Sequence, residues 1–136
     1  MAKRTLFDVV KEIALRLKEN QHIHAMWLEG SYATEKFTEN SDIDVWLDID
    51  NGMFDECIDI VRKELQKVGK IDAEEARGIY SQNPKLAKHI FHLKGFPKAQ
   101  TIELDLQEHS REFTFSRKEH IIKILFDKDE TIQWQP

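Results

Sequence analysis

The stretch that decides the fold reads Leu-Glu-Gly-Ser at residues 28–31 and, after a ten-residue gap, Asp-Ile-Asp-Val-Trp-Leu-Asp-Ile at residues 42–49. Apolar side chains alternate strictly with others through the second segment, which predicts a β-strand with one buried face. The opposite face carries Asp42, Asp44, Trp46 and Asp48. We expect the first segment to end a strand at Gly30 and to turn there into a short helix.

Two carboxylates on this predicted strand favour a metal site. Asp42 and Asp44 are two residues apart, so both side chains leave the same face of the sheet, about 5–7 Å from each other. That spacing suits a pair of metal ions about 3.5–4 Å apart, and oxygen ligands of this kind suit Mg²⁺. Like charges raise each other's pKa unless a cation compensates. The pair therefore predicts binding of divalent cations.

Gly30 and Ser31 favour a phosphate site in this context. A strand that turns into a helix presents backbone N–H groups where the helix dipole attracts an anion. Glycine removes the side chain that would keep a phosphate from the backbone, and the serine hydroxyl adds a donor. Alone, a Gly-Ser pair is usually a turn and Asp-x-Asp a solvated face, so the functional interpretation depends on their combination in this order.

Hydrophobic periodicity predicts the other elements. Thr5 and Asp8 have the spacing of a capping box, and Asn20 is the expected end of the first helix. We expect helices over 5–20 and 54–68 and strands over 22–29, 71–76, 87–94, 100–107 and 119–126, with breakers at Gly78, Pro84, Gly95 and Pro97. Without an internal repeat or linker, the sequence predicts a single domain over residues 1–136. Its class is α+β, with a mixed β-sheet and helices packed on one face.

The composition predicts a soluble protein. The 136 residues are 40 % apolar and 33 % charged, and the net charge of −5 gives no indication of a face for nonspecific nucleic-acid binding. No apolar stretch approaches the roughly 20 residues of a membrane span, and no signal-peptide pattern follows Met1–Arg4. Cys57 is the only cysteine, so a reducing cytoplasm is the expected compartment.

Residues 30–31, Gly-Ser, followed by residues 41–45, Ser-Asp-Ile-Asp-Val, resemble the signature of the DNA polymerase beta-type nucleotidyltransferase superfamily. Within it, the minimal and aminoglycoside-type nucleotidyltransferases are the most similar. The ending Leu-Phe-Asp-Lys-Asp-Glu at residues 125–130 is more weakly similar to a segment that follows the third catalytic strand in relatives. The resemblance implies a nucleotidyltransferase-like fold and two Mg²⁺ ions. It also implies transfer of a nucleoside monophosphate from a nucleoside triphosphate, with ATP as the expected donor, to an acceptor hydroxyl, with release of pyrophosphate.

The family needs a third carboxylate on a later strand. The matching position is Asp105, about 60 residues after the Asp-x-Asp pair, and Glu103 on the same face is the rival. The resemblance makes Asp42, Asp44 and Asp105 the catalytic and metal-binding residues, with Asp105 as general base. It makes Gly30 and Ser31 the residues that bind the nucleotide's phosphates.

This sequence departs from the family pattern in two places. Many minimal members carry a basic residue soon after Gly-Ser, whereas here the nearest cation is Lys36, which either binds nucleotide or is a solvated loop lysine. Complete small-molecule transferases usually add a C-terminal helical domain, and this chain ends at Pro136. We therefore expect the acceptor site to come from a helical protein partner, a second copy in a homodimer, or a C-terminal part outside this chain.

Two functional hypotheses follow. The first is an enzyme that nucleotidylates a small molecule or a protein side chain. The second is a binding module, the minimal-nucleotidyltransferase half of an antitoxin-like pair, which docks to a small helical protein. The sequence does not identify the acceptor.

The spacing of the histidines does not predict a zinc site. His22 and His24 alternate on a predicted strand, and His89 and His92 lie three residues apart on another. No cysteine or second acidic cluster completes either pair to a tetrahedral set. His109, near Asp105, is expected on the surface.

Overall fold

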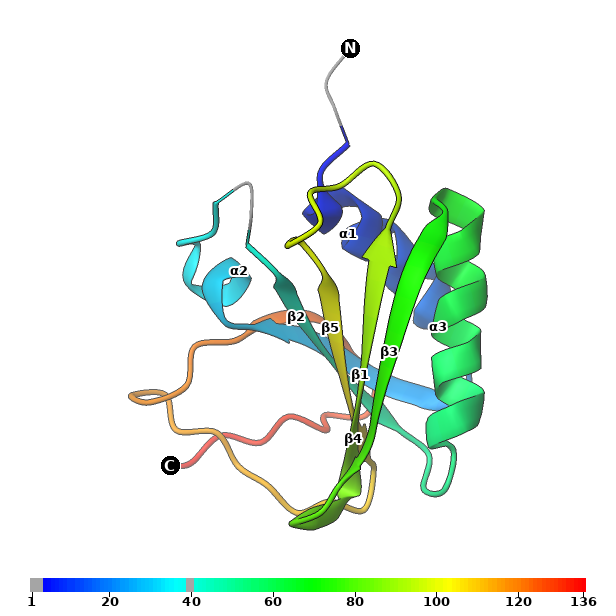
Figure 1. Ribbon diagram of the computed structural model, residues 1–136. Helices are drawn as coiled ribbons and strands as arrows, with labels where there is room; N and C mark the ends of the chain where they lie inside the picture. Colours follow the sequence, from blue (N-terminus) through cyan, green and yellow to red (C-terminus); the bar gives the residue numbers. More distant parts are fainter. Residues whose placement is uncertain (1–3, 39–40) are drawn as a thin grey trace.

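The computed structural model describes residues 4–38 and 41–136, which form a mixed β-sheet with helices on one face (Figure 1). The expected α+β class is therefore confirmed. None of the helices in the described residues is both long and apolar enough to cross a membrane. Residues 1–3, part of the segment used to judge signal peptides, lie outside the described residues. The elements are α1 (Leu6–Leu17), β1 (Ile23–Glu29), α2 (Ser31–Thr34), β2 (Ile43–Ile49), α3 (Phe54–Val68), β3 (Ile71–Tyr80), β4 (Asn83–Leu93), β5 (Ile102–Glu108) and β6 (Lys123–Asp127).

The order of the strands places the Asp-x-Asp strand in the middle of the sheet. The order is β3-β4-β5-β2-β1-β6, in which β2 and β5 are parallel and the other neighbours antiparallel. The parallel register aligns Asp44 with Glu103 and Trp46 with Asp105. Because aligned residues of neighbouring strands point to the same face, the acids of β2 and β5 share one face of the sheet.

Helices α1 and α3 cover the other face, where the larger apolar core lies. The predicted capping box begins α1: the N–H of Asp8 donates to Thr5 Oγ1 at 3.1 Å, and the N–H of Thr5 donates to Asp8 Oδ2 at 2.9 Å. The helix ends at Leu17, before the predicted end at Asn20, and α3 has the predicted bounds. The buried apolar side chains of β2 point into this core, as their alternation predicted.

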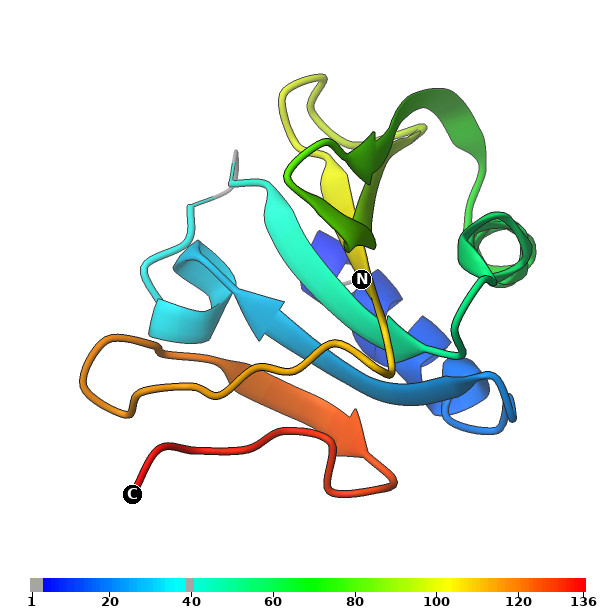
Figure 2. The ribbon, with the colours of Figure 1, turned by 90° about the horizontal axis from the view of Figure 1, so that it is seen from below.

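Part of the acidic face has its own apolar cluster. Trp27 is fully buried there and its ring stacks on Trp46, with 5.9 Å between ring centroids. The segments after β5 and after β6 both lie on the side of the sheet away from α1 (Figure 2), and a bridge between Phe115 and Trp134 joins them. The rest of the cluster is Ala25, Phe113, Ile122 and Ile132.

The hairpin of β3 and β4 is longer than the sequence predicted. Two residues expected to break strands lie inside it, Gly78 in β3 and Pro84 in β4. Gly78 has a φ of +73° where the register shifts, as in a β-bulge, and Pro84 is the second residue of its strand, where a missing N–H is tolerated. The last strand, β6, begins at Lys123, four residues after the predicted start.

Candidate active site

The two halves of the Gly-Ser and Asp-x-Asp motif touch each other. Strand β1 ends at Glu29, and Gly30 then adopts φ +72° and ψ −149° before the single turn of α2, a backbone region that only glycine enters readily. A Cβ atom on Gly30 would overlap Asp44 Oδ2. The absence of a side chain at residue 30 therefore allows the carboxylate of Asp44 to lie against the turn.

Asp44 and Glu103 face each other across β2 and β5. Burial raises the pKa of Asp44, and the hydrogen bond and negative charge of Glu103 raise it further, to about 7. The positive charge of Lys88 opposes this shift. Two carboxylates held this close repel each other when both are ionised, and a bound cation relieves that repulsion.

Asp42 lies just before β2 and is held by the start of β5. Its Oδ1 accepts hydrogen bonds from the backbone N–H of Thr101 at 2.8 Å and from Thr101 Oγ1 at 2.9 Å. Both bonds use the same oxygen, so Oδ2 is left for a ligand. Thr101 thus fixes the orientation of the first predicted acid.

Asp105 lies on the same face but one pleat farther along β5, opposite Trp46. Its Oδ1 accepts a hydrogen bond from the Tyr80 hydroxyl at 2.5 Å, and Lys88 Nζ lies 3.8 Å from its Oδ2. Burial raises the pKa of Asp105, whereas Tyr80 and Lys88 act in the opposite direction. The same Lys88 Nζ is 3.8 Å from Glu103 Oε2. The ammonium group of Lys88 therefore lies close to both candidates for the third acid.

The residues predicted to bind phosphate lie around α2. Ser31 is half-buried, and its hydroxyl has no hydrogen-bond partner within residues 4–38 and 41–136. Its carbonyl oxygen accepts the N–H of Lys36 at 3.0 Å. The Lys36 side chain is exposed, so this lysine lies in the loop that follows the turn.

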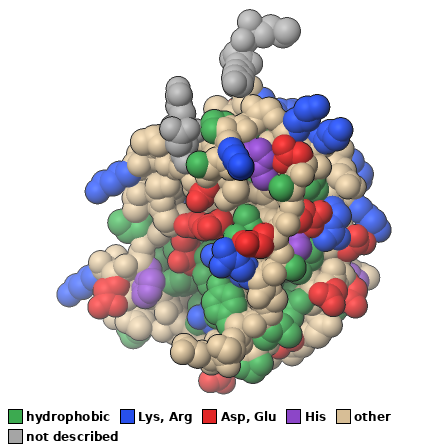
Figure 3. All heavy atoms as spheres, in the orientation of Figure 1, with side chains coloured by type: hydrophobic (Ala, Val, Ile, Leu, Met, Phe, Trp, Pro, Cys, Tyr) green, Lys and Arg blue, Asp and Glu red, His purple; other side chains and the backbone are tan. Residues whose placement is uncertain are grey.

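The donor set of this site suits Mg²⁺, because it consists of carboxylate oxygens. Acidic side chains gather on the surface over the region of β2 and β5 (Figure 3). Within the described part of the chain, however, the predicted trio of Asp42, Asp44 and Asp105 does not form a group with ligand atoms all within 4.8 Å of one another. Asp44 and Glu103 are directly opposed, while Asp42 is turned to Thr101 and Asp105 to Tyr80.

The sequence reasoning missed Lys88 and Tyr80. Lys88 is aligned with Asp105 in the antiparallel pair of β4 and β5, and the alternation of β4 could have placed it on the acidic face. Tyr80 lies beyond the predicted end of its strand and reaches Asp105 only because the hairpin is longer. No local signal identifies it.

Comparison with known proteins identifies the family of this chain. No curated protein matches the chain. The family model of the polymerase beta nucleotidyltransferases matches residues 11–95, a range that contains the Gly30 turn and β2 but ends before β5. Because this match covers more than half of the 136 residues, the chain belongs to the polymerase beta nucleotidyltransferase family.

Proposed function

We propose that this protein transfers a nucleoside monophosphate from a nucleoside triphosphate, ATP in the first instance, to an acceptor hydroxyl and releases pyrophosphate in a Mg²⁺-dependent reaction. The observation that carries the proposal is the close approach of Asp44 to Gly30. This approach puts a carboxylate beside a turn that has no side chain to hold a phosphate away. A metal-binding group and a phosphate-binding turn are thereby adjacent.

Each residue has a separate task in this reaction. Gly30 and Ser31 bind the terminal phosphates, and Lys36 approaches them from the loop. Asp42 and Asp44 hold the nucleotide's Mg²⁺, and together with the third acid they hold a second ion. Bound Mg²⁺ neutralises phosphate charge and lowers the pKa of the acceptor hydroxyl.

The third acid accepts the proton of the acceptor hydroxyl. Asp105 is our candidate because it is buried, and because Tyr80 and Lys88 orient its carboxylate. Glu103 is the rival because it is aligned with Asp44. Comparing Asp105→Asn with Glu103→Gln under single-turnover conditions decides between them, since loss of the general base slows the chemical step more than it weakens nucleotide binding.

The proposal is tested by incubating the protein with labelled nucleoside triphosphates, Mg²⁺ and candidate acceptors. We expect transfer that requires Mg²⁺ and falls by a factor of about 100 or more in Asp44→Asn. Mg²⁺ with a nucleoside triphosphate should also raise the melting temperature of the wild type, because the ligand binds the folded state. Neither effect of Mg²⁺ should persist in Asp44→Asn.

Asp59→Asn is the matched control, because it makes the same substitution on the exposed side of α3, where Asp59 pairs with Lys63 at 3.0 Å. This variant should transfer like the wild type. Near-normal transfer by Asp44→Asn would remove the metal assignment, and equal loss in both variants would point to a defect of folding or charge.

The second candidate function is docking to a small helical protein. One observation favours it: a cleft of about 900 Å³ beside α2, whose wall includes the aromatic rings of Phe7, Tyr32, Phe37 and Phe96. Tyr32 and Phe37 stack there with 4.4 Å between ring centroids. If docking is the main activity, Phe37→Ala should weaken a complex with the helical partner in size-exclusion chromatography while Asp44→Asn leaves it intact.

A further inference from the structure

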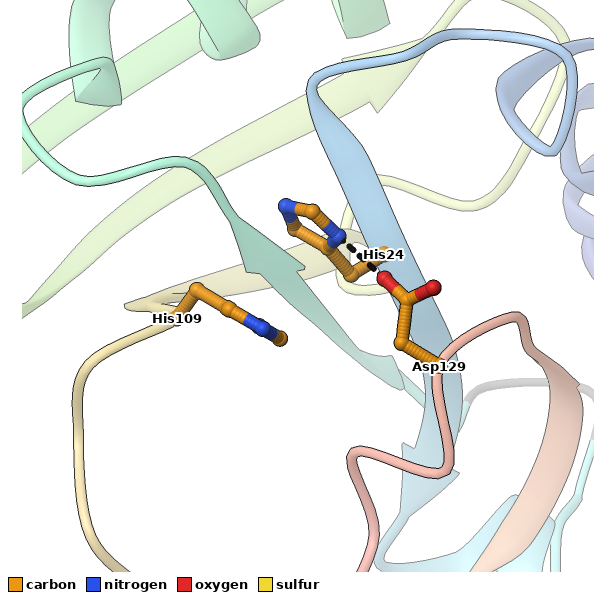
Figure 4. A group of neighbouring side chains, drawn as sticks. All are labelled: His24, His109 and Asp129. Carbon is orange, nitrogen blue, oxygen red and sulfur yellow. Dashed lines mark hydrogen bonds and ion pairs between the residues drawn. The ribbon is translucent and has the colours of Figure 1, made fainter.

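A second cluster of metal-ligating side chains lies at the opposite end of β1 and β2 from Gly30 and Asp44. His24 from β1, His109 from the end of β5 and Asp129 from the turn after β6 converge there (Figure 4). Each offers one ligand atom, and these atoms all lie within 4.8 Å of one another. Within residues 4–38 and 41–136 this is the one group of three or more such residues that meets this distance. It brings together positions as far as 105 residues apart.

The chemistry of this group differs from that of the carboxylate site. Two imidazole nitrogens and one carboxylate oxygen form a ligand set typical of zinc sites in which water occupies the fourth position. Mg²⁺ prefers oxygen ligands alone. The two ends of the sheet are therefore suited to different ions.

The surrounding carboxylates are the observation that separates this group from an ordinary surface cluster. His24 Nε2 is 2.6 Å from Asp50 Oδ1, and His109 Nδ1 is 2.5 Å from Asp48 Oδ1. Asp48 is completely buried, and the side-chain amide of Gln107 donates to its Oδ2 at 2.7 Å. Each histidine thus has one ring nitrogen on a carboxylate. Such a bond fixes the tautomer of a histidine that binds a metal through its other nitrogen, and at His24 it also orients the ring.

The remaining ring nitrogens are the candidate ligand atoms. His24 Nδ1 is 2.6 Å from Asp129 Oδ2, and a cation that displaces the proton between them is bound by both atoms. His109 Nε2 has no hydrogen-bond partner among the described residues. The rings of His24 and His109 stack with 4.1 Å between centroids, so sharing an ion requires one ring to turn. The His109 side chain, 44 % exposed, has the freedom to do so.

We propose that His24, His109 and Asp129 form a Zn²⁺ site with a fourth position for water, supported by Asp48 and Asp50. The ion joins β1 to the two segments that cross the face of Trp27. The ion thereby holds the segment after β6 over the apolar cluster around Trp27. This site is independent of the proposed transfer reaction and of Mg²⁺.

The test is a titration of the full chain with Zn²⁺ by calorimetry and with Co²⁺ by visible absorption, which distinguishes four-coordinate from six-coordinate Co²⁺. We expect one equivalent of Zn²⁺ to bind and Co²⁺ to give the intense bands of a four-coordinate site. His109→Ala and Asp129→Asn should each weaken binding at least tenfold, and Asp50→Asn should weaken it about 10–100-fold through the orientation of His24. Both ligand substitutions fall on exposed side chains, and circular dichroism verifies the fold.

His92→Ala is the control, because His92 also pairs with a carboxylate, Asp72, at 2.6 Å between Nδ1 and Oδ1 but belongs to no such group. It should bind Zn²⁺ like the wild type. Asp44→Asn should also keep the Co²⁺ bands, so failure of the proposed transferase and failure of this site are distinguishable. The proposal is overturned if the wild type binds no Zn²⁺ at micromolar protein, if Co²⁺ remains six-coordinate, or if His109→Ala and Asp129→Asn bind like His92→Ala.

Discussion

At Gly30 the backbone conformation and the neighbouring carboxylate both exclude a side chain. We expect Gly30→Ala to lower the free energy of unfolding by about 1–3 kcal/mol and to abolish nucleotide binding, because the new Cβ displaces Asp44. Urea unfolding and calorimetry with Mg²⁺ and a nucleoside triphosphate measure the two effects. Gly52→Ala is the control, since Gly52 has nearly the same φ, +75°, with open space around it. Equal destabilisation and unchanged binding in both variants would contradict the contact argument.

The raised pKa of Asp44 predicts that stability depends on pH in Mg²⁺-free buffer. Its pKa is about 7 in the folded chain against an ordinary value of 3.8, so the folded state holds the proton more tightly. The contribution of Asp44 to the free energy of unfolding should therefore fall as the pH rises from about 4 to about 7. Asp44→Asn removes this loss and should be more stable than the wild type at pH 8, by on the order of 1 kcal/mol after discounting for solvent screening.

The measurement is urea unfolding of both proteins between pH 4 and pH 8. The advantage of Asp44→Asn should shrink towards pH 4. Asp59→Asn changes the net charge equally, but lysine and arginine neighbours lower the pKa of Asp59, so its effect should have the opposite sign. A pH-independent advantage of Asp44→Asn would contradict the raised pKa that burial and Glu103 give to Asp44.

Among the elements, α1 depends on its first turn. Thr5→Ala removes the acceptor for the N–H of Asp8 and should lower the free energy of unfolding by about 1 kcal/mol. Thermal unfolding followed by circular dichroism measures the loss. Ser81→Ala, in the exposed turn between β3 and β4, makes a comparable change without a cap and should leave the stability unchanged. A similar loss in both variants would mean that the cap contributes nothing specific.

The elements also show what the sequence could predict. The Thr5 cap and the alternation through β2 depend on residues a few positions apart, so local rules identified them. The hairpin of β3 and β4 was cut short because Gly78 and Pro84 break a regular strand. A bulge and a strand end accept these residues, but only the pairing partner determines that such a site exists. Tyr80 was missed as a partner of Asp105 for the same reason.

For the whole molecule, local sequence patterns do not specify which distant segments come into contact. The sequence led us to expect no zinc site because no histidine pair had a third ligand nearby in the chain. Folding brings His109, which follows β5, and Asp129, which follows β6, to His24 on β1. The choice between Asp105 and Glu103 was likewise left open, since it depends on the register of β5 against β2, which periodicity does not specify.

The two apolar clusters lie on opposite faces of one sheet, and this arrangement predicts how the molecule unfolds. All three tryptophans belong to the cluster around Trp27, so their fluorescence reports on that face, whereas far-ultraviolet circular dichroism reports mainly on the helices of the other. Because β1 and β2 contribute side chains to both clusters, we expect the two signals to give one urea midpoint. Phe115→Ala should lower both midpoints together, with a loss of about 3–5 kcal/mol if the site does not collapse. A tryptophan transition that precedes the loss of helix would show instead that the segments after β5 and β6 detach from the sheet on their own.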